Sequence, residues 1–302
     1  MLAPIVIFVY NRPYHTQQAI SALRNNDLAG ASELFIYSDA PRNERDSESV
    51  RLVREYIHVI DGFKKITVIE RNQNLGLAAS IIDGVTSLVN QYGKVIVLED
   101  DLVTSPQFLT FMNDALDFYQ HESEVMHISG WNYPIDPEGL GDAFLWPVMN
   151  CWGWATWADR WVYFHKNPAK LINTWSREDI KRFNLENSCD FWAQVIKNNN
   201  KKITTWAVFW YASIFERKGL CLNPTHSFVV NIGLDDSGEN CGSYNPFPLN
   251  LSNRKVWILP QRIEASNLAV QRVKLFCTSI KSNLIIRLLR RVNKILGSKF
   301  CV

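Results

Sequence analysis

Short apolar runs alternate with amphipathic segments through the first hundred residues, and this alternation restricts the fold more than any other feature. The segments 15–25, 49–60 and 77–92 repeat apolar residues at helical spacing. Between them lie short runs rich in β-branched or aromatic residues, which predict strands at 5–10, 34–37, 66–70 and 95–98. Strands that alternate with helices form a right-handed, mainly parallel sheet. We therefore expect an α/β fold with a Rossmann-like sheet and helices on both faces.

The length and composition of the chain allow one large domain with an appendage. The chain has 302 residues, 47% of them hydrophobic, and a net charge of +2. We expect a main domain at 1–265 with halves 1–125 and 126–265, because the sequence becomes aromatic-rich and irregular from residue 126, and a basic tail at 266–302. The six cysteines show no C-x-x-C spacing, which favours free thiols in a reducing compartment. We interpret the apolar start as a strand and expect no signal peptide or membrane span.

Polar and charged side chains follow each of the predicted strands. Because the carboxyl ends of parallel strands meet at one edge of a sheet, groups placed there gather at a site. The candidates are Asn11 and Arg12 after the first strand, Asp39 and Arg42 after the second, Arg71 and Asn72 after the third, and Glu99, Asp100 and Asp101 after the fourth.

The carboxylates at 99–101 are the most informative of these groups. Adjacent carboxylates repel one another and keep their charge only beside something positive. A hard divalent cation that bridges phosphate oxygens is the usual occupant of such a position. The run therefore predicts metal-dependent chemistry on a phosphorylated donor, and the alternative is a strand that ends in a solvated acidic turn.

Two other positions at this edge also have alternatives. Asp39 can accept a hydrogen bond from a uracil N–H or a ribose hydroxyl, or it can be a turn residue before Pro41. Arg71 and Asn72 precede Gly76, where the lack of a side chain would let the backbone approach a donor. The alternative for this stretch is a helix-entry turn with Asn74 as the helix cap.

Five segments together resemble the GT-A glycosyltransferases, and within them the bacterial family 2-like sugar transferases and the N-acetylglucosaminyltransferase I family. They are VYNRP at 9–13, YSDAPR at 37–42, RNQNLGL at 71–77, EDDL at 99–102 and CWGWATW at 151–157, and the likeness spans roughly residues 3–245. The resemblance implies a GT-A type fold in which the acidic run plays the part of the D-x-D motif. It implies that Asp101 binds Mn²⁺ or Mg²⁺, while Glu99 and Asp100 face the ribose and the sugar.

An inverting transfer also needs a base that removes the proton of the acceptor hydroxyl. The resembling families place a carboxylate in a W-D or D-x-W context, which here matches Asp190, although a helix-capping role is the alternative. Residues 231–241 are similar to a segment that often reads S-G-T-H-C, with Asn240 at the His position, so this chain would bind metal more weakly or use another group there. The alternative bases are Asp235 and Asp236, and the tryptophans expected to pack against sugar, if they are not core, are Trp131, Trp152 and Trp154.

The tail combines apolar and basic residues at helical spacing. No acidic residue follows Glu264, and eight lysines and arginines occur between 272 and 299. A basic amphipathic helix of this kind lies on an anionic membrane surface, and the alternative is a helix docked on the protein's own core. We expect the C-terminal helix to hold a cytoplasmic protein on the inner face of a bacterial cytoplasmic membrane.

The sequence thus predicts a metal-dependent, inverting glycosyltransferase, of the hexosyl- or N-acetylhexosaminyl-transferring kind. It would move a sugar from a nucleotide sugar, with a UDP-sugar expected, to a glycan or lipid-linked acceptor hydroxyl in bacterial surface polysaccharide synthesis, with no nucleic-acid partner. A sugar-1-phosphate nucleotidyltransferase is one alternative, but those enzymes carry a Gly-rich loop where this chain has residues 11–14. A non-catalytic, membrane-bound carbohydrate-binding module is the other.

Overall fold

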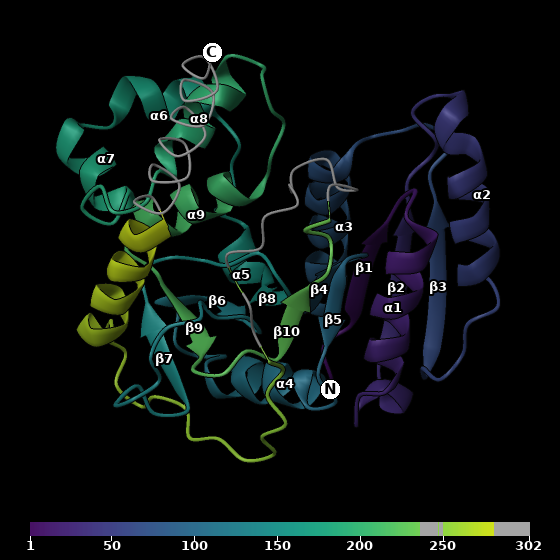
Figure 1. The fold of residues 1–302 in the computed structure, drawn as a ribbon, viewed down its shortest axis with the longest axis horizontal. Helices are drawn as coiled ribbons and strands as arrows, with labels where there is room; N and C mark the ends of the chain where they lie inside the picture. Colours follow the sequence, from purple (N-terminus) through teal and green to yellow (C-terminus); the bar gives the residue numbers. More distant parts are fainter. Residues whose placement is uncertain (236–246, 248–249, 281–302) are drawn as a thin grey trace, which may run out of the picture.

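The computed structural model describes residues 1–235, 247 and 250–280, and it contains one large sheet flanked by helices (Figure 1). Eight strands form this sheet in the order β3-β2-β1-β4-β8-β6-β9-β7. Their bounds are β1 Ile5–Val9, β2 Glu33–Ser38, β3 Lys65–Glu70, β4 Lys94–Glu99, β6 Val125–Ser129, β7 Ala143–Trp146, β8 Trp154–Trp157 and β9 Leu220–Pro224.

The first four strands pair in parallel and confirm the predicted strands to within one residue at each end. β1 lies between β2 and β4, and β2 pairs with β3. All five residues of β1 are buried, as in a parallel strand that is covered on both faces. The mainly parallel, Rossmann-like α/β sheet of the GT-A type is therefore confirmed.

Helices cover both faces of this sheet. The helices α1 Pro13–Arg24, α2 Glu44–Ile57 and α4 Phe108–Phe118 pack on one face, and α3 Leu77–Tyr92 packs on the other. The predicted α3 is confirmed at both ends. The helix α2 begins five residues before its predicted start at residue 49, because the Asn43 side chain caps it by accepting from Arg45 N. Its first turn is polar, so apolar spacing gave no signal there.

The second half joins the sheet with a change of direction. β8 pairs antiparallel to β4 and β6, β6 pairs parallel to β9, and β7 pairs antiparallel to β9. A small separate sheet pairs β5, Leu102–Thr104, with β10, Val229–Asn231. The remaining elements are the 3₁₀ turn η1 Ala29–Ala31 and the helices α5 Ala158–Trp161, α6 Pro168–Thr174, α7 Arg177–Phe183, α8 Trp192–Asn199 and α9 Ala207–Glu216.

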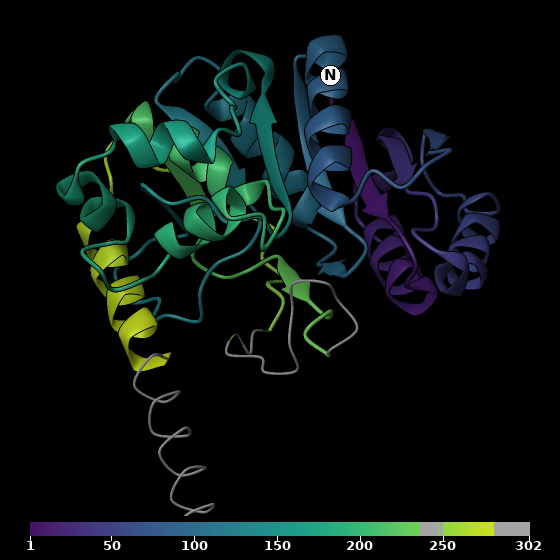
Figure 2. The same cartoon turned by 90° about the horizontal axis from the view of Figure 1, so that it is seen from above.

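The start of the basic tail packs on the domain. Residues 267–280 are helical, and this helix lies along the edge of the second half, away from α1 and α2 (Figure 2). Ala269 and Val273 are buried, and Arg272 Nη2 lies 3.1 Å from Asp136 Oδ2. Residues 281–302, which hold most of the predicted membrane-binding stretch, lie outside the described residues. Within the described ranges, no helix is long and apolar enough to cross a bilayer.

Candidate active site

The carboxyl ends of the parallel strands bring the candidate residues to one edge of the sheet, as predicted. Backbone hydrogen bonds link successive strand ends: Asp39 N donates to Val9 O at 3.2 Å, and Arg71 N donates to Ser38 O at 2.9 Å. β1 and β4 are neighbours, with Phe8 opposite Glu99. Residues that follow β1 therefore lie beside residues that follow β4.

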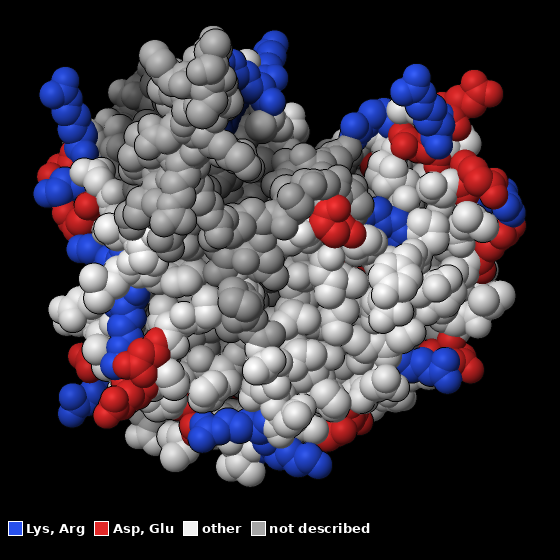
Figure 3. Space-filling view, viewed as in Figure 1, with Lys and Arg blue, Asp and Glu red and all other residues white. Residues whose placement is uncertain are grey.

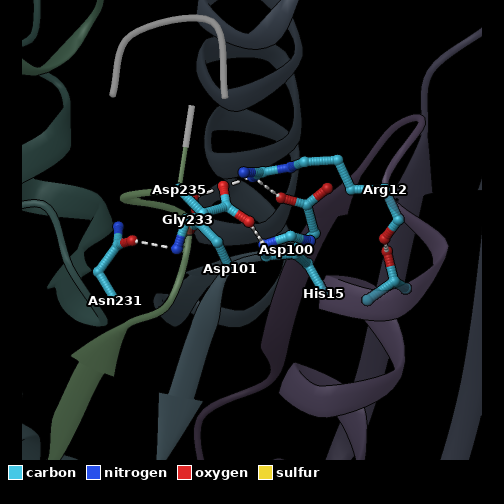
Figure 4. A network of polar contacts seen from close by, with 8 residues as sticks. Arg12, His15, Asp100, Asp101, Asn231, Gly233 and Asp235 are labelled. Carbon is cyan, nitrogen blue, oxygen red and sulfur yellow. Dashed lines mark hydrogen bonds and ion pairs between the residues drawn. The ribbon is translucent and has the colours of Figure 1, made fainter. Parts of the chain in front are cut away.

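An arginine lies between the aspartates that follow β4. Asp100 and Asp101 are 5% and 6% exposed. Arg12 Nη2 donates to Asp101 Oδ2 at 2.9 Å and also to Asp100 Oδ1, as Figure 4 shows. Arg12 is the residue before α1, and its carbonyl accepts from Thr16 Oγ1 at 2.9 Å. The positive group that the acidic run required is thus supplied, in this structure, by the chain itself.

Burial and charge shift the pKa values of this cluster. Burial raises the pKa of Glu99, and the charges of Asp101 and Asp100 raise it further. Burial also raises the pKa of Asp100, while the Arg12 guanidinium acts in the opposite direction. Burial by itself would lower the pKa of Arg12, but the two aspartates raise it above its ordinary value. The cluster is therefore a buried site with more carboxylates than cations, which favours binding of a further positive group.

A segment from the second half of the chain covers this cluster. We call residues 229–235 the covering segment; its first three residues are β10. Ile232 N donates to Asp101 O at 2.9 Å, and Gly233 N donates to Asn231 Oδ1 at 2.7 Å. A Cβ atom on Gly233 would lie 2.8 Å from Arg12 Nη1 and would contact Asp101 Oδ2. Any larger residue at this position would require the covering segment, the guanidinium or the carboxylate to shift.

His15 is a site residue that the sequence analysis missed. Its Nε2 lies 3.1 Å from Asp235 Oδ2 of the covering segment, and a positive charge on its ring would lower the pKa of Asp100 (Figure 4). The side chain of His15 is 10% exposed and that of Asp235 is 47% exposed. The spacing between histidines could not reveal the pair of His15 and Asp235, because Asp235 is not a histidine and lies more than two hundred residues after His15. The available signal was that His15 follows Arg12 by three residues at the start of α1.

Asp39 holds the loop that leads into α3. Its carboxylate accepts from Leu75 N at 2.9 Å, from Gly76 N at 2.8 Å and from Ala40 N at 3.0 Å. Gly76 has φ 75° and precedes α3 with no side-chain cap. Asn74 instead donates to Ala40 O at 2.7 Å, so the alternative in which Asn74 caps the helix is wrong. Leu75 N also contacts Oδ2 at 3.2 Å, so the carboxylate of Asp39 accepts four contacts, about as many as a carboxylate can, and these fit its turn role.

The other edge residues make local contacts. Asn11 Nδ2 donates to Asp46 Oδ1 at 3.0 Å, which fixes the first turn of α2. Arg71 pairs with Asp83 of α3 and lies over the Tyr37 ring at 5.0 Å. Asn72 is exposed at the surface.

A groove of about 590 Å³ separates the two halves beside this edge. Arg42 and residues 75–78 line one side, and residues 201–204, which include Lys201 and Lys202, line the other. This volume is in the range of ligand sites for small molecules. The space-filling view shows the molecule hollowed between its two lobes, with Lys and Arg side chains at both borders (Figure 3). The second half thus contributes two lysines that the sequence analysis did not single out.

The residues expected to act on the acceptor lie at the acidic cluster only in part. Asp190 is exposed, and its Oδ1 accepts from Ala193 N at 3.3 Å, as a helix cap does. Within the described part of the chain, no polar contact joins Asp190 to the acidic cluster. Asp235 is in the cluster network, whereas Asp236 and Asn240 lie outside the described residues.

The tryptophans expected to pack against sugar are mostly core residues. Trp154 is 0% exposed, and its ring stacks on His127 and Trp206 with centroids 5.4 and 4.9 Å away. A sugar-packing role for Trp154 does not fit this burial, because protein rings cover its faces. Trp131 is 4% exposed, and only Trp152 keeps appreciable exposed surface.

The two aspartates fit a metal that is held mainly by substrate. Among the residues that the structure describes, no group of three or more His, Cys, Asp or Glu side chains is arranged to hold a metal ion. Mg²⁺ usually binds through one or two carboxylates together with substrate phosphates. Asp101 and Asp100 can supply those carboxylates, and Arg12 contacts only one oxygen of each.

The model of glycosyl transferase family 2 matches residues 5–175. The chain belongs to this family. The matched region contains β1–β4, Arg12, Asp39 and the acidic run, but neither Asp190 nor the covering segment. Family membership confirms the family 2 part of the resemblance.

Comparison with solved structures finds distant likenesses to S. aureus TarS. TarS 1–349 has a TM-score of 0.43 and 10% identity, over 76% of this chain and 60% of that one. TarS itself and TarS 1–349 in complex with UDP each have a TM-score of 0.31 and 15% identity, over 43% of this chain and 21% and 35% of theirs. The chain spans less than two thirds of the length of each of these structures. No curated protein matches the sequence.

Proposed function

We propose that this family 2 glycosyltransferase moves a sugar from a nucleoside diphosphate sugar to an acceptor hydroxyl. The observation that carries the proposal is the pairing of Arg12 with Asp100 and Asp101 at the carboxyl edge of the parallel sheet. These groups lie at the sheet edge where ligands of such folds bind. The groove next to the loop that Asp39 holds has basic side chains on both sides, which suits a diphosphate.

The leaving group explains why charge gathers here. A nucleoside diphosphate departs as a polyanion, so cations placed at the diphosphate stabilise the transition state. Mg²⁺ or Mn²⁺, held by Asp101 and the phosphates, would supply Lewis-acid charge stabilisation. Arg12 can donate further hydrogen bonds to phosphate oxygens. We propose a UDP-sugar as the donor, because Asp39, the carboxylate expected to accept from uracil or ribose, follows β2 and holds residues 75 and 76, which line the groove.

The acceptor side needs a base for an inverting transfer. Asp190 is our proposed base from its sequence context, and Asp235 is the alternative. The network in Figure 4 favours Asp235, because it contacts His15 beside the acidic cluster while Asp190 contacts its own helix. We further propose that the sugar is a hexose or N-acetylhexosamine and that it is transferred to a glycan or lipid-linked acceptor. This transfer would belong to surface polysaccharide synthesis at the cytoplasmic membrane surface. We also propose a relationship to the N-acetylglucosaminyltransferase I family.

The identity of the donor can be tested by measuring metal-dependent binding and slow hydrolysis of a panel of nucleotide sugars. Hydrolysis without acceptor would distinguish an enzyme from a carbohydrate-binding module. Asp101→Ala should reduce metal-dependent UDP-sugar affinity by about 10²-fold or more, because it removes the carboxylate expected to bind the metal. Asp61→Ala is a matched control, since Asp61 is 75% exposed and pairs with Arg24 away from the cluster. Unchanged metal-dependent affinity in folded Asp101→Ala protein would contradict the metal assignment.

A further inference from the structure

The Arg12 guanidinium already occupies the carboxylate oxygens that a metal would use. Its side chain is 15% exposed, and those of Asp100 and Asp101 are 7% and 8% exposed. Nη2 contacts both carboxylates, and Nη1 is buried without a hydrogen-bond partner among the described residues. A buried donor that lacks a partner is costly, which indicates that Nη1 is placed for a ligand oxygen.

The surrounding backbone fixes this arrangement. Pro13 begins α1 directly after Arg12, and both Thr16 N and Thr16 Oγ1 donate to Arg12 O. The covering segment closes the other side, where Gly233 lies against Arg12 Nη1 and Asp101. The guanidinium is therefore held in a covered position between the aspartates.

A divalent cation at this site would lie close to the guanidinium. Arg12 Nη2 contacts one oxygen of each aspartate, Oδ1 of Asp100 and Oδ2 of Asp101, and a Mg²⁺ bound to either carboxylate at about 2.0–2.1 Å would lie a few ångströms from it. Two cations held by the same carboxylates repel each other in a buried site. Arg12 in its present position therefore opposes metal binding at Asp101, and its departure from Asp101 Oδ2 would favour it.

We propose that Arg12 is a displaceable counter-ion of the Asp100–Asp101 pair, which opposes binding of a free divalent cation and moves onto the diphosphate when metal and nucleotide bind together. The unpartnered Nη1 and the released Nη2 then donate to phosphate oxygens in the fork geometry that arginine presents. This inference rests on the proposed nucleoside diphosphate donor. It explains how the protein offsets part of the charge of its acidic cluster when no donor is bound.

Titration of the full chain with Mn²⁺ in the absence of nucleotide tests the competition, with free Mn²⁺ followed by electron paramagnetic resonance. Arg12→Gln should bind Mn²⁺ at least about 10-fold more tightly than the wild type, because it removes the competing charge. In the presence of Mn²⁺, the same variant should bind UDP about 10-fold more weakly, because the diphosphate loses its guanidinium partner. Arg24→Gln is the matched control: it removes the same charge from the end of the same helix, where Arg24 is 55% exposed. The control should stay within about twofold of the wild type.

Arg12→Lys provides a second variant if the glutamine variant fails to fold, as judged by circular dichroism and thermal melting. A lysine keeps the charge but lacks the planar fork, so Mn²⁺ affinity should rise by a smaller factor. Equal or weaker Mn²⁺ binding by the folded Arg12 variants would overturn the inference, as would wild-type protein that binds Mn²⁺ equally well with and without UDP. Failure of the proposed function is distinguishable, because the panel of nucleotide sugars would then show no binding or hydrolysis, whereas the titration with Mn²⁺ alone still decides the role of Arg12.

Discussion

Gly233→Ala tests whether the covering segment must lie directly against the acidic cluster. The added Cβ would lie 2.8 Å from Arg12 Nη1 and 2.9 Å from Asp101 Cβ, and closer still to Asp101 Oδ2. Ordinary contacts begin at about 3.5 Å, so the segment or the carboxylate must shift by roughly 0.5–1 Å. Gly233 has no left-handed φ, so the effect is steric. Overpacking of this kind costs about 1–3 kcal/mol of folding stability, and a misplacement near 1 Å can lower turnover by about 10²-fold.

Urea unfolding and turnover of a UDP-sugar measure the two consequences of Gly233→Ala. Gly30→Ala is the matched control, because a Cβ at Gly30 meets no atom within 4 Å. The control should keep both stability and turnover, while Gly233→Ala should lose both. If Gly233→Ala keeps wild-type turnover within about twofold, the close approach is not needed for activity and the reasoning fails.

Three further predictions address stability, the base and the tail. Burial lowers the pKa of His127 to about 3, so below pH 6.5 only the unfolded chain gains a proton there. His127 alone should therefore lower folding stability by roughly 2 kcal/mol between pH 7 and pH 5, while the raised pKa values of Glu99 and Asp100 act in the opposite direction, so urea unfolding should show this contribution as the difference in pH dependence between the wild type and His127→Gln. Asp190→Asn should keep donor affinity and lower turnover by about 10²-fold or more; if only Asp235→Asn does so, Asp235 is the base. The full chain should co-sediment with anionic vesicles at low salt and less at high salt, with about 1 kcal/mol from each basic residue, and truncation after residue 280 should abolish binding but leave the domain folded.

The first half of the fold could be predicted because its signals are local. Runs of β-branched residues gave β1–β4, and helical spacing gave α1–α3. The early start of α2 escaped because a polar cap, Asn43, sets it. In the second half, strands such as β8 are buried among aromatic residues, so no alternation of polar and apolar residues marks them.

The composition of the site could be predicted only in part. The acidic run required a positive neighbour, but the identity of that neighbour depends on strand order: β1 lies beside β4, which brings Arg12 to Asp100 and Asp101. The pairing of β5 with β10 likewise joins segments more than one hundred residues apart. Spacing within the sequence carries no information about either contact.

The acidic run lies where the sheet changes direction, and this explains how repelling carboxylates stay in place. β4 is held in parallel by β1 and antiparallel by β8, so the strand that leads to Glu99 is fixed on both sides. Directly after the run, β5 leaves the sheet and pairs with β10, which fixes the chain again at Leu102. The backbone of the run is thus anchored before and after its carboxylates, and within the run Ile232 N donates a hydrogen bond to Asp101 O. Burial raises the pKa values of Glu99 and Asp100, so protonation and Arg12 together reduce the negative charge of this anchored run, and a bound divalent cation would favour the ionised carboxylates again.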